Sequence, residues 1–84
     1  MTHFWLAGQL IVVNMDALWT PLQFTWDEQL HQVEDILDRW RIDQGWWRER
    51  VWREYFRLTT HTGLLAEIFH DLTTQYWYLQ RLYD

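Results

Sequence analysis

The middle of the chain carries arginine and tryptophan side chains that could bind single-stranded nucleic acid. Exposed indole rings stack on bases, which contributes roughly 1–3 kcal/mol per base, and guanidinium groups bind phosphates. Segment 39–57 holds six arginines and three acids, whereas the rest of the chain holds one arginine and nine acids, an asymmetry typical of a binding face. The candidate binding face consists of Arg39, Arg41, Trp46, Trp47, Arg48, Arg50, Arg53 and Arg57.

Packing offers a second interpretation of the same segment. Eight tryptophans in 84 residues are many, and large aromatic side chains dominate the cores of short chains. We expect Trp40, Trp52 and Trp77 to fill the core. Trp46 and Trp47 are adjacent, so on a strand they point to opposite faces, and one must be exposed or covered by a partner. In this interpretation the arginines pair with acids, which are Asp43, Glu49, Glu54 and Glu67.

The net charge opposes nucleic-acid binding. Twelve acidic and seven basic residues give a net charge of −5 at pH 7, and every basic residue is an arginine. Proteins that bind nucleic acid through bulk charge usually carry an excess of basic residues. The charge therefore favours a protein partner, and nucleic acid stays the alternative.

The residue types needed for catalysis are missing or badly spaced. Cysteine and serine are absent, which excludes thiol and serine nucleophiles, disulfides and thiolate–zinc sites. The adjacent acids Glu34 and Asp35 diverge on a strand, and the three glycines form no phosphate-binding loop. His61 and His70 would lie at opposite ends of one strand, roughly 25–30 Å apart. We therefore expect no enzyme activity, no catalytic residue, no metal site and no cofactor.

The C-terminal part of the chain predicts three antiparallel strands that would position this segment. They cover Glu54–Thr60, Leu64–His70 and Tyr76–Tyr83, which are rich in aromatic and β-branched residues. Turns are expected at His61–Gly63 and Asp71–Gln75. A three-residue loop that ends in glycine favours a type I turn with a bulge, in which the glycine takes positive φ.

That loop length predicts the register of the first hairpin. Counting outward from the turn places Phe56 opposite Ile68 on one face and Arg57 opposite Glu67 on the other. A two-residue loop would instead place Phe56 opposite Glu67. Because the three-residue register gives one apolar face, we expect Arg57 and Glu67 to lie within ion-pair distance.

Residues 27–42 allow two interpretations. Their apolar residues fall at the i, i+3, i+4 and i+7 spacing of a helix, and these are Val33, Ile36, Leu37 and Trp40. The competing interpretation is a hairpin, with a strand at Leu22–Trp26, a turn at Asp27–Gln29 and a long bulged strand to Ile42. A slip at a bulge can make strand spacing mimic helical spacing.

The N-terminal residues are expected to form an apolar arm. The apolar run from Phe4 to Val13 has ten residues, and a membrane span needs about 20. The run lacks the basic start of a signal peptide, and Ile11 favours a strand together with the two valines after it. Pro21 divides this arm, residues 1–20, from a domain at residues 21–84. We expect a cytoplasmic protein without a membrane partner.

Several short motifs resemble those of a small bacterial domain of unknown function. They are Leu37-Asp38-Arg39-Trp40-Arg41, Trp46-Trp47-Arg48, Tyr55-Phe56-Arg57, Gly63-Leu64, Asp71-Leu72 and Trp77-Tyr78-Leu79-Gln80-Arg81. This family occurs free-standing and as a C-terminal appendage of Y-family DNA-polymerase-like proteins of mutagenic repair. The resemblance covers about the last 50–60 residues and extends weakly to Phe24-Thr25-Trp26.

The resemblance implies a hairpin after Trp26, because family members often carry a basic glycine turn there. This chain departs from the family with Asp27-Glu28-Gln29 at that turn, which weakens any expectation of a phosphate contact. It also has Gln75 where relatives often place a glycine. The family has no established activity, so the resemblance implies no catalytic residue.

Together these features predict an all-β fold, a small SH3-like barrel or antiparallel meander of about five strands. The alternative is an α+β fold with one helix around 28–40. The expected function is a non-catalytic protein-interaction module linked to DNA repair or mutagenic replication. Its partner would be a polymerase-like protein or a second copy held through the arm. The alternative function is a module that binds single-stranded nucleic acid through segment 39–57.

Overall fold

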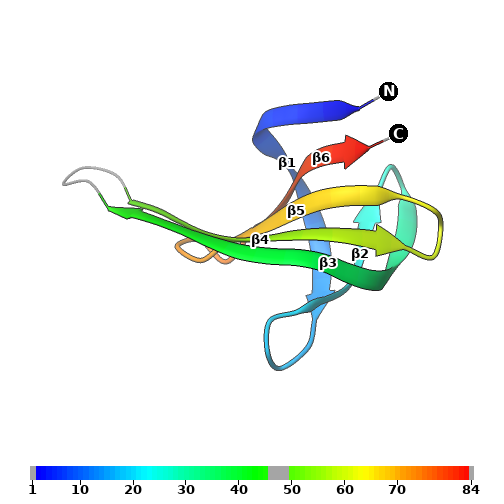
Figure 1. The fold of residues 1–84 in the computed structure, drawn as a ribbon, viewed down its shortest axis with the longest axis horizontal. Coiled ribbons are helices and arrows are strands. Elements are labelled where there is room, and N and C mark those ends of the chain that lie inside the picture. Colours follow the sequence, from blue (N-terminus) through cyan, green and yellow to red (C-terminus); the bar gives the residue numbers. More distant parts are fainter. Residues whose placement is uncertain (1, 46–49, 84) are drawn as a thin grey trace.

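The computed structural model is an antiparallel barrel and describes residues 2–45 and 50–83. The candidate residues Trp46, Trp47 and Arg48, and the expected partner Glu49, lie outside the described residues. Strands follow one another around the barrel in chain order, and β1 pairs with β6 to close it (Figure 1). The strands are β1 (His3–Met15), β2 (Pro21–Trp26), β3 (Gln29–Gly45), β4 (Arg50–Thr60), β5 (Leu65–Asp71) and β6 (Trp77–Tyr83).

The all-β prediction is confirmed, and the helix expected as an alternative around 28–40 is wrong. Those residues belong to β3, whose pairing with β4 slips between Val33 and Asp35 and again between Ile36 and Asp38. Each slip inserts an extra residue and breaks the period-two alternation of a strand. The four apolar residues therefore acquire helical spacing although the backbone is extended.

The turn before β3 explains how an acidic pair replaces glycine there. Asp27 and Glu28 have φ of 52° and 60°, and Trp26 pairs with Gln29 across them. Two successive residues with positive φ are the geometry of a type I′ hairpin turn, which glycine and asparagine usually occupy. The hairpin is therefore formed at the cost of two side chains in the left-handed region.

The register predicted for β4 and β5 is confirmed. Phe56 lies opposite Ile68, and Arg57 lies opposite Glu67. The turn contains Gly63 at φ 91°, and its amide donates to the Thr60 carbonyl at 3.1 Å. Loop length and face alternation were therefore sufficient to place these strands.

The apolar N-terminal run forms β1, which raises the strand count from the expected five to six. It pairs with β2 on one side and with β6 on the other, so most of the expected arm, residues 3–15, is a wall of the barrel. The β1–β6 register slips between Phe4 and Gln9. Within this slip Gly8 has φ 83°, and a Cβ there would lie 2.8 Å from Tyr78 Cβ and 3.0 Å from Phe69 Cε2. Glycine is required at this bulge by both its conformation and its contacts.

Every strand contributes to the core inside the barrel. Fully buried aromatic and aliphatic side chains come from β2, β4, β5 and β6, and β3 adds the half-buried Val33. At one end the Trp5 and Trp26 rings pack edge to face with centroids 5.1 Å apart. Trp77 is 5% exposed, which confirms its expected place in the core, whereas Trp40 and Trp52 are only half-buried.

The β3–β4 hairpin extends beyond the barrel wall. Pairing of β4 with β5 begins at Arg53, so the last residues of β3 and the first of β4 pair only with each other. Figure 1 shows this hairpin projecting away from the other strands. The hairpin carries most of the arginine-rich segment. Within the described residues there is no helix long and apolar enough to cross a membrane.

Candidate binding face on the β3–β4 hairpin

Strand register divides the arginines between the two faces of the hairpin. Arg41 lies opposite Glu54 and Gly45 lies opposite Arg50, so Arg41 and Arg50 share the face that continues into the barrel interior. Arg53 and Arg57 lie on the opposite, outer face of β4. Arg39 lies opposite Phe56 and shares the inner face with Arg41 and Arg50. A nucleic-acid strand would need at least three of the arginines on one face, and among the described residues the inner face supplies these three and the outer face two.

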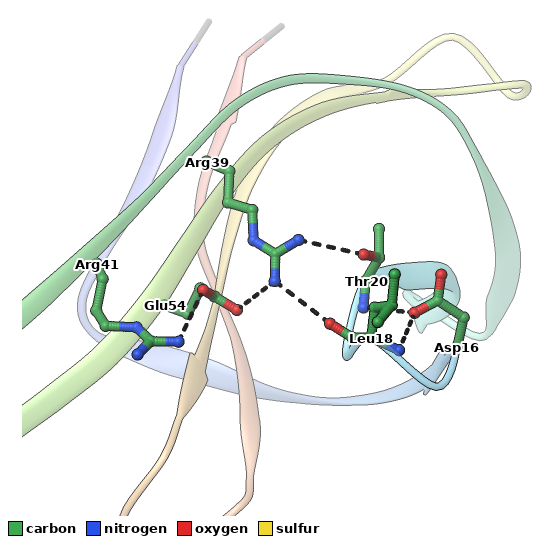
Figure 2. Close-up of polar contacts among 6 residues, drawn as sticks. All are labelled: Asp16, Leu18, Thr20, Arg39, Arg41 and Glu54. Carbon is green, nitrogen blue, oxygen red and sulfur yellow. Dashed lines mark hydrogen bonds and ion pairs between the residues drawn. The ribbon is translucent and has the colours of Figure 1, made fainter.

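Two of the arginines bind the same buried carboxylate. The Arg39 Nη2 and Glu54 Oε1 atoms are 2.8 Å apart, and the Arg41 Nη2 and Glu54 Oε2 atoms are 3.2 Å apart. Arg39 also donates to Thr20 Oγ1 at 3.3 Å and to the Leu18 carbonyl at 3.4 Å, which ties β3 to the β1–β2 loop (Figure 2). Figure 2 shows the three charged side chains converging between the strands and that loop.

The loop that accepts these bonds is itself held by a carboxylate. Asp16 Oδ1 accepts from the amides of Leu18 at 2.8 Å and Thr20 at 3.0 Å. Such side-chain-to-backbone bonds are the usual means of fixing a tight turn. Trp19, between the two donors, takes φ 64°. Asp16 thus holds the loop in the conformation in which the Leu18 carbonyl and the Thr20 hydroxyl accept hydrogen bonds from Arg39.

Glu54 is ionised despite its burial. Its side chain is 7% exposed. Burial raises the pKa of Glu54, but the guanidinium groups of Arg39 and Arg41 together lower the pKa further, so that it lies below its ordinary value of 4.5. The carboxylate therefore carries its charge at neutral pH and neutralises part of the charge of the two arginines.

The outer face of the hairpin base is filled by a stack of aromatic rings. It runs across four strands from Trp40 through Tyr55 and Phe69 to Tyr78, with successive centroids 5.4, 5.1 and 5.0 Å apart. Arg53 lies over Phe69 at 4.5 Å and donates to the Tyr55 hydroxyl at 3.3 Å. The rings that might stack on bases are therefore occupied by one another and by Arg53.

The predicted contact between Arg57 and Glu67 is present on this outer face. Arg57 Nε lies 3.5 Å from Glu67 Oε1, and its Nη2 lies 3.5 Å from Asp38 Oδ2. Glu67 also faces Arg81 at 3.7 Å and accepts from the Tyr83 hydroxyl at 3.1 Å. Because Arg57 is 40% exposed, its contact with Glu67 contributes at most about 1 kcal/mol.

Arg50, near the end of the hairpin, is also engaged. Its Nε and Nη2 donate to the two Asp43 oxygens at 3.3 and 3.2 Å, and its guanidinium lies 4.5 Å from the Trp52 ring centroid. Both charged side chains are about half exposed. Of the acids expected to pair with the arginines, Asp43, Glu54 and Glu67 do so, and Glu49 lies outside the described residues.

His70 was considered from the sequence only as a metal ligand, whereas the structure buries it beside this charged cluster. Its ring stacks on Trp77 with centroids 4.3 Å apart, and the edge-on Trp19 ring is 5.6 Å away. Neither ring nitrogen has a hydrogen-bond partner among the described residues. The signal was available, because residue 70 shares the inward face with Ile68.

Burial determines the protonation of His70. It lowers the pKa of the imidazole below its ordinary value of 6.5, and Gln75 with the carboxylates of Glu54 and Asp71 opposes only part of that effect. The ring is therefore neutral at neutral pH. Within the part of the chain that the structure describes, no three histidine or acidic side chains are grouped to hold a metal, and no pocket is present.

A second exposed surface is apolar and extends over β1 and the first residues of β3. Val12 of β1 lies beside Thr25 of β2, which lies beside Leu30 of β3, and Leu10 shares the outer face of β1 with Val12. The exposed fractions are 71% for Val12, 57% for Leu10 and 50% for Leu30. We call Leu10, Val12 and Leu30 the β1 face.

Comparisons with protein-family models, characterised proteins and solved structures find no match to this chain.

Proposed function

We propose that the chain is a non-catalytic protein-interaction module that docks through the β1 face. The observation that carries this proposal is the exposure of three large aliphatic side chains on one sheet face, where only Thr25 separates Val12 from Leu30. Single exposed apolar residues are common, but contiguous ones with polar surroundings are typical of protein interfaces. Val12, at 71% exposure, is the centre of this surface.

The contacts of the arginines support the same proposal. A phosphate would have to displace Glu54 from Arg39 and Arg41, Asp43 from Arg50, and a ring from Arg53. Counterion release favours nucleic-acid binding only where cationic groups are free to neutralise phosphates. The net charge of −5 adds repulsion, so single-stranded nucleic acid is the weaker alternative.

The proposed partner is a protein of the mutagenic DNA-repair system. The support for this setting is the resemblance to domains appended to Y-family DNA-polymerase-like proteins. An appended domain is covalently joined to the polymerase-like protein. A free-standing domain would need a docking surface to bind that protein. An apolar surface such as the β1 face is suited to that task. This setting places the protein in the cytoplasm.

The test is binding to a Y-family polymerase-like protein, measured by biolayer interferometry with one charge introduced on the β1 face. Val12→Asp places a carboxylate at the centre of the interface and should weaken binding at least tenfold. The matched control is Leu37→Asp, because Leu37 is 54% exposed but lies at the β3 bulge. Circular dichroism verifies that both variants fold. Wild-type affinity in the Val12 variant, or a greater loss in the control, would contradict the proposal.

A further inference from the structure

The far end of β3 has a free edge. One side of β3 pairs with β4 as far as Gly45, whereas the other side pairs with β2 only over residues 29–32. Both register slips of β3 precede Asp38, and from Asp38 to Gly45 the pairing with β4 is regular. Residues 39–45 therefore present a regular row of backbone donors and acceptors without a partner strand among the described residues.

Free edges attract other strands, and bulges and charges usually protect them. The bulges protect the part of β3 next to the barrel. On the regular part, Arg39, Arg41 and Asp43 alternate with Trp40 and Ile42. Because these charges have both signs, they repel some strand registers and stabilise others. The charges can therefore show in which register the edges of two copies of this chain would pair.

Symmetry limits how two copies can pair along this edge. In an antiparallel pair, residues directly opposite each other lie on the same face of the sheet. Odd-numbered residues of segment 39–45 lie on one face and even-numbered residues on the other. A two-fold axis between two residues would oppose odd with even, so the axis must pass through a residue.

Charge and the length of the paired segment together select one of the possible residues. An axis at Gln44 would pair only residues 43–45 of the segment. An axis at Arg39, Arg41 or Asp43 opposes that residue with its own copy, and an axis at Trp40 opposes Arg39 with Arg41 twice. An axis at Ile42 opposes Arg41 with Asp43 twice, Trp40 with Gln44 twice, and no two like charges. It also pairs all seven residues of segment 39–45.

We propose that two copies of this chain associate through the free edges of β3, antiparallel about a two-fold axis at Ile42. The contacts within each copy extend across this axis. Arg41 is already bound to Glu54 and Asp43 to Arg50, so each new Arg41–Asp43 pair joins a chain of alternating charges, Glu54–Arg41–Asp43–Arg50. Figure 1 shows the hairpin that carries this edge projecting away from the other strands.

Cysteine cross-linking tests both the association and its register, because the chain contains no cysteine. In the proposed dimer the two Ile42 Cα atoms are opposite each other, about 4.5–5.5 Å apart, which is within the range of a disulfide. The two Gln44 Cα atoms are about 14 Å apart at the strand rise, which is too far. Under mild oxidation Ile42→Cys should form a covalent dimer, and Gln44→Cys should stay monomeric on non-reducing gels.

A charge exchange tests the same register without a covalent link. Asp43→Arg and Arg41→Asp each oppose like charges in their own homodimers, whereas a mixture of the two restores both opposite-charge pairs. Light scattering should therefore give the 10.6 kDa monomer for each variant and twice that mass for the wild type and for the mixture. Glu28→Arg, a matched charge change at the β2–β3 turn, should leave the mass unchanged. A wild type that is monomeric at every concentration, or a Gln44→Cys variant that links as fast as Ile42→Cys, would overturn the proposal.

Discussion

Replacing Glu54 with glutamine removes the buried charge that holds Arg39 and Arg41. The amide has nearly the same shape and can still accept one hydrogen bond, so the substitution changes the charge more than the packing. It leaves two guanidinium groups beside the barrel interior without their anion. We expect Glu54→Gln to fold and to be less stable than the wild type at neutral pH.

The magnitude follows from the exposure of the three side chains. A hydrogen bond to a charged group contributes about 1.5–3 kcal/mol when buried, and an exposed ion pair about 0–1 kcal/mol. Glu54 is 7% exposed, but Arg39 and Arg41 are 40% and 52% exposed and can regain water. We therefore expect a loss of about 2 kcal/mol in the free energy of unfolding, or roughly 8–16 °C in the melting temperature.

The pH dependence separates this charge effect from a packing defect. Because the pKa of Glu54 is lower in the folded chain than its ordinary value of 4.5, the folded state holds the proton less tightly than the unfolded state. The stabilisation is thus complete above about pH 4.5 and is lost as the pH falls through the folded pKa. Urea unfolding, followed by tryptophan fluorescence, should show the difference between wild type and Glu54→Gln shrinking in acid. A difference below about 0.5 kcal/mol at neutral pH, or one that is constant down to pH 3, would refute the reasoning.

Three further substitutions have defined outcomes in urea unfolding. Gly63→Val should cost about 1–2 kcal/mol, because a branched side chain is strained at positive φ; an unchanged midpoint would mean a different turn. Gly8→Ala should lower the free energy of unfolding by about 2–4 kcal/mol, because the alanine is strained at positive φ and its Cβ also clashes with Tyr78 and Phe69. A smaller loss of stability than for Gly63→Val would count against that packing. The pKa of His70 is lowered by burial, so the unfolded state binds its proton more tightly and stability declines below about pH 6.5; His70→Phe should reduce this decline, and an unaltered pH profile would exclude the effect.

Short sequence patterns predicted the parts of the fold in which paired strands follow each other directly in the sequence. The glycine turn and the alternation of faces were enough to pair Phe56 with Ile68. The apolar spacing of β3 was ambiguous between strand and helix, because the bulge before Asp35 shifts that spacing toward that of a helix. Closure of the barrel joins β1 and β6 from opposite ends of the chain, and no local pattern specifies which distant strands meet.

The sequence predicted which residue types form the candidate site, but only part of the contacts between them. The sequence indicated that arginines could pair with Glu54, but the choice of Arg39 and Arg41 depends on the β3–β4 register. That register depends on two bulges whose positions carry no distinct sequence signal. The burial of His70 was predictable from the alternation of side chains along β5. The exposure of Val12 was not, because it depends on whether another segment of the chain covers the outer face of β1.

The most direct test of the account is a titration of the chain with single-stranded DNA at two salt concentrations, followed by tryptophan fluorescence and mobility shift. If the arginines are held within the chain and the β1 face is the docking surface, binding should be weak at both salt concentrations and fluorescence should not be quenched. Three free phosphate contacts would instead give a slope near −2 for log K against log salt, at about 0.7 per contact. Tight binding with that slope and with quenching, reduced by about one contact in Arg50→Ala or Arg53→Ala, would contradict the account.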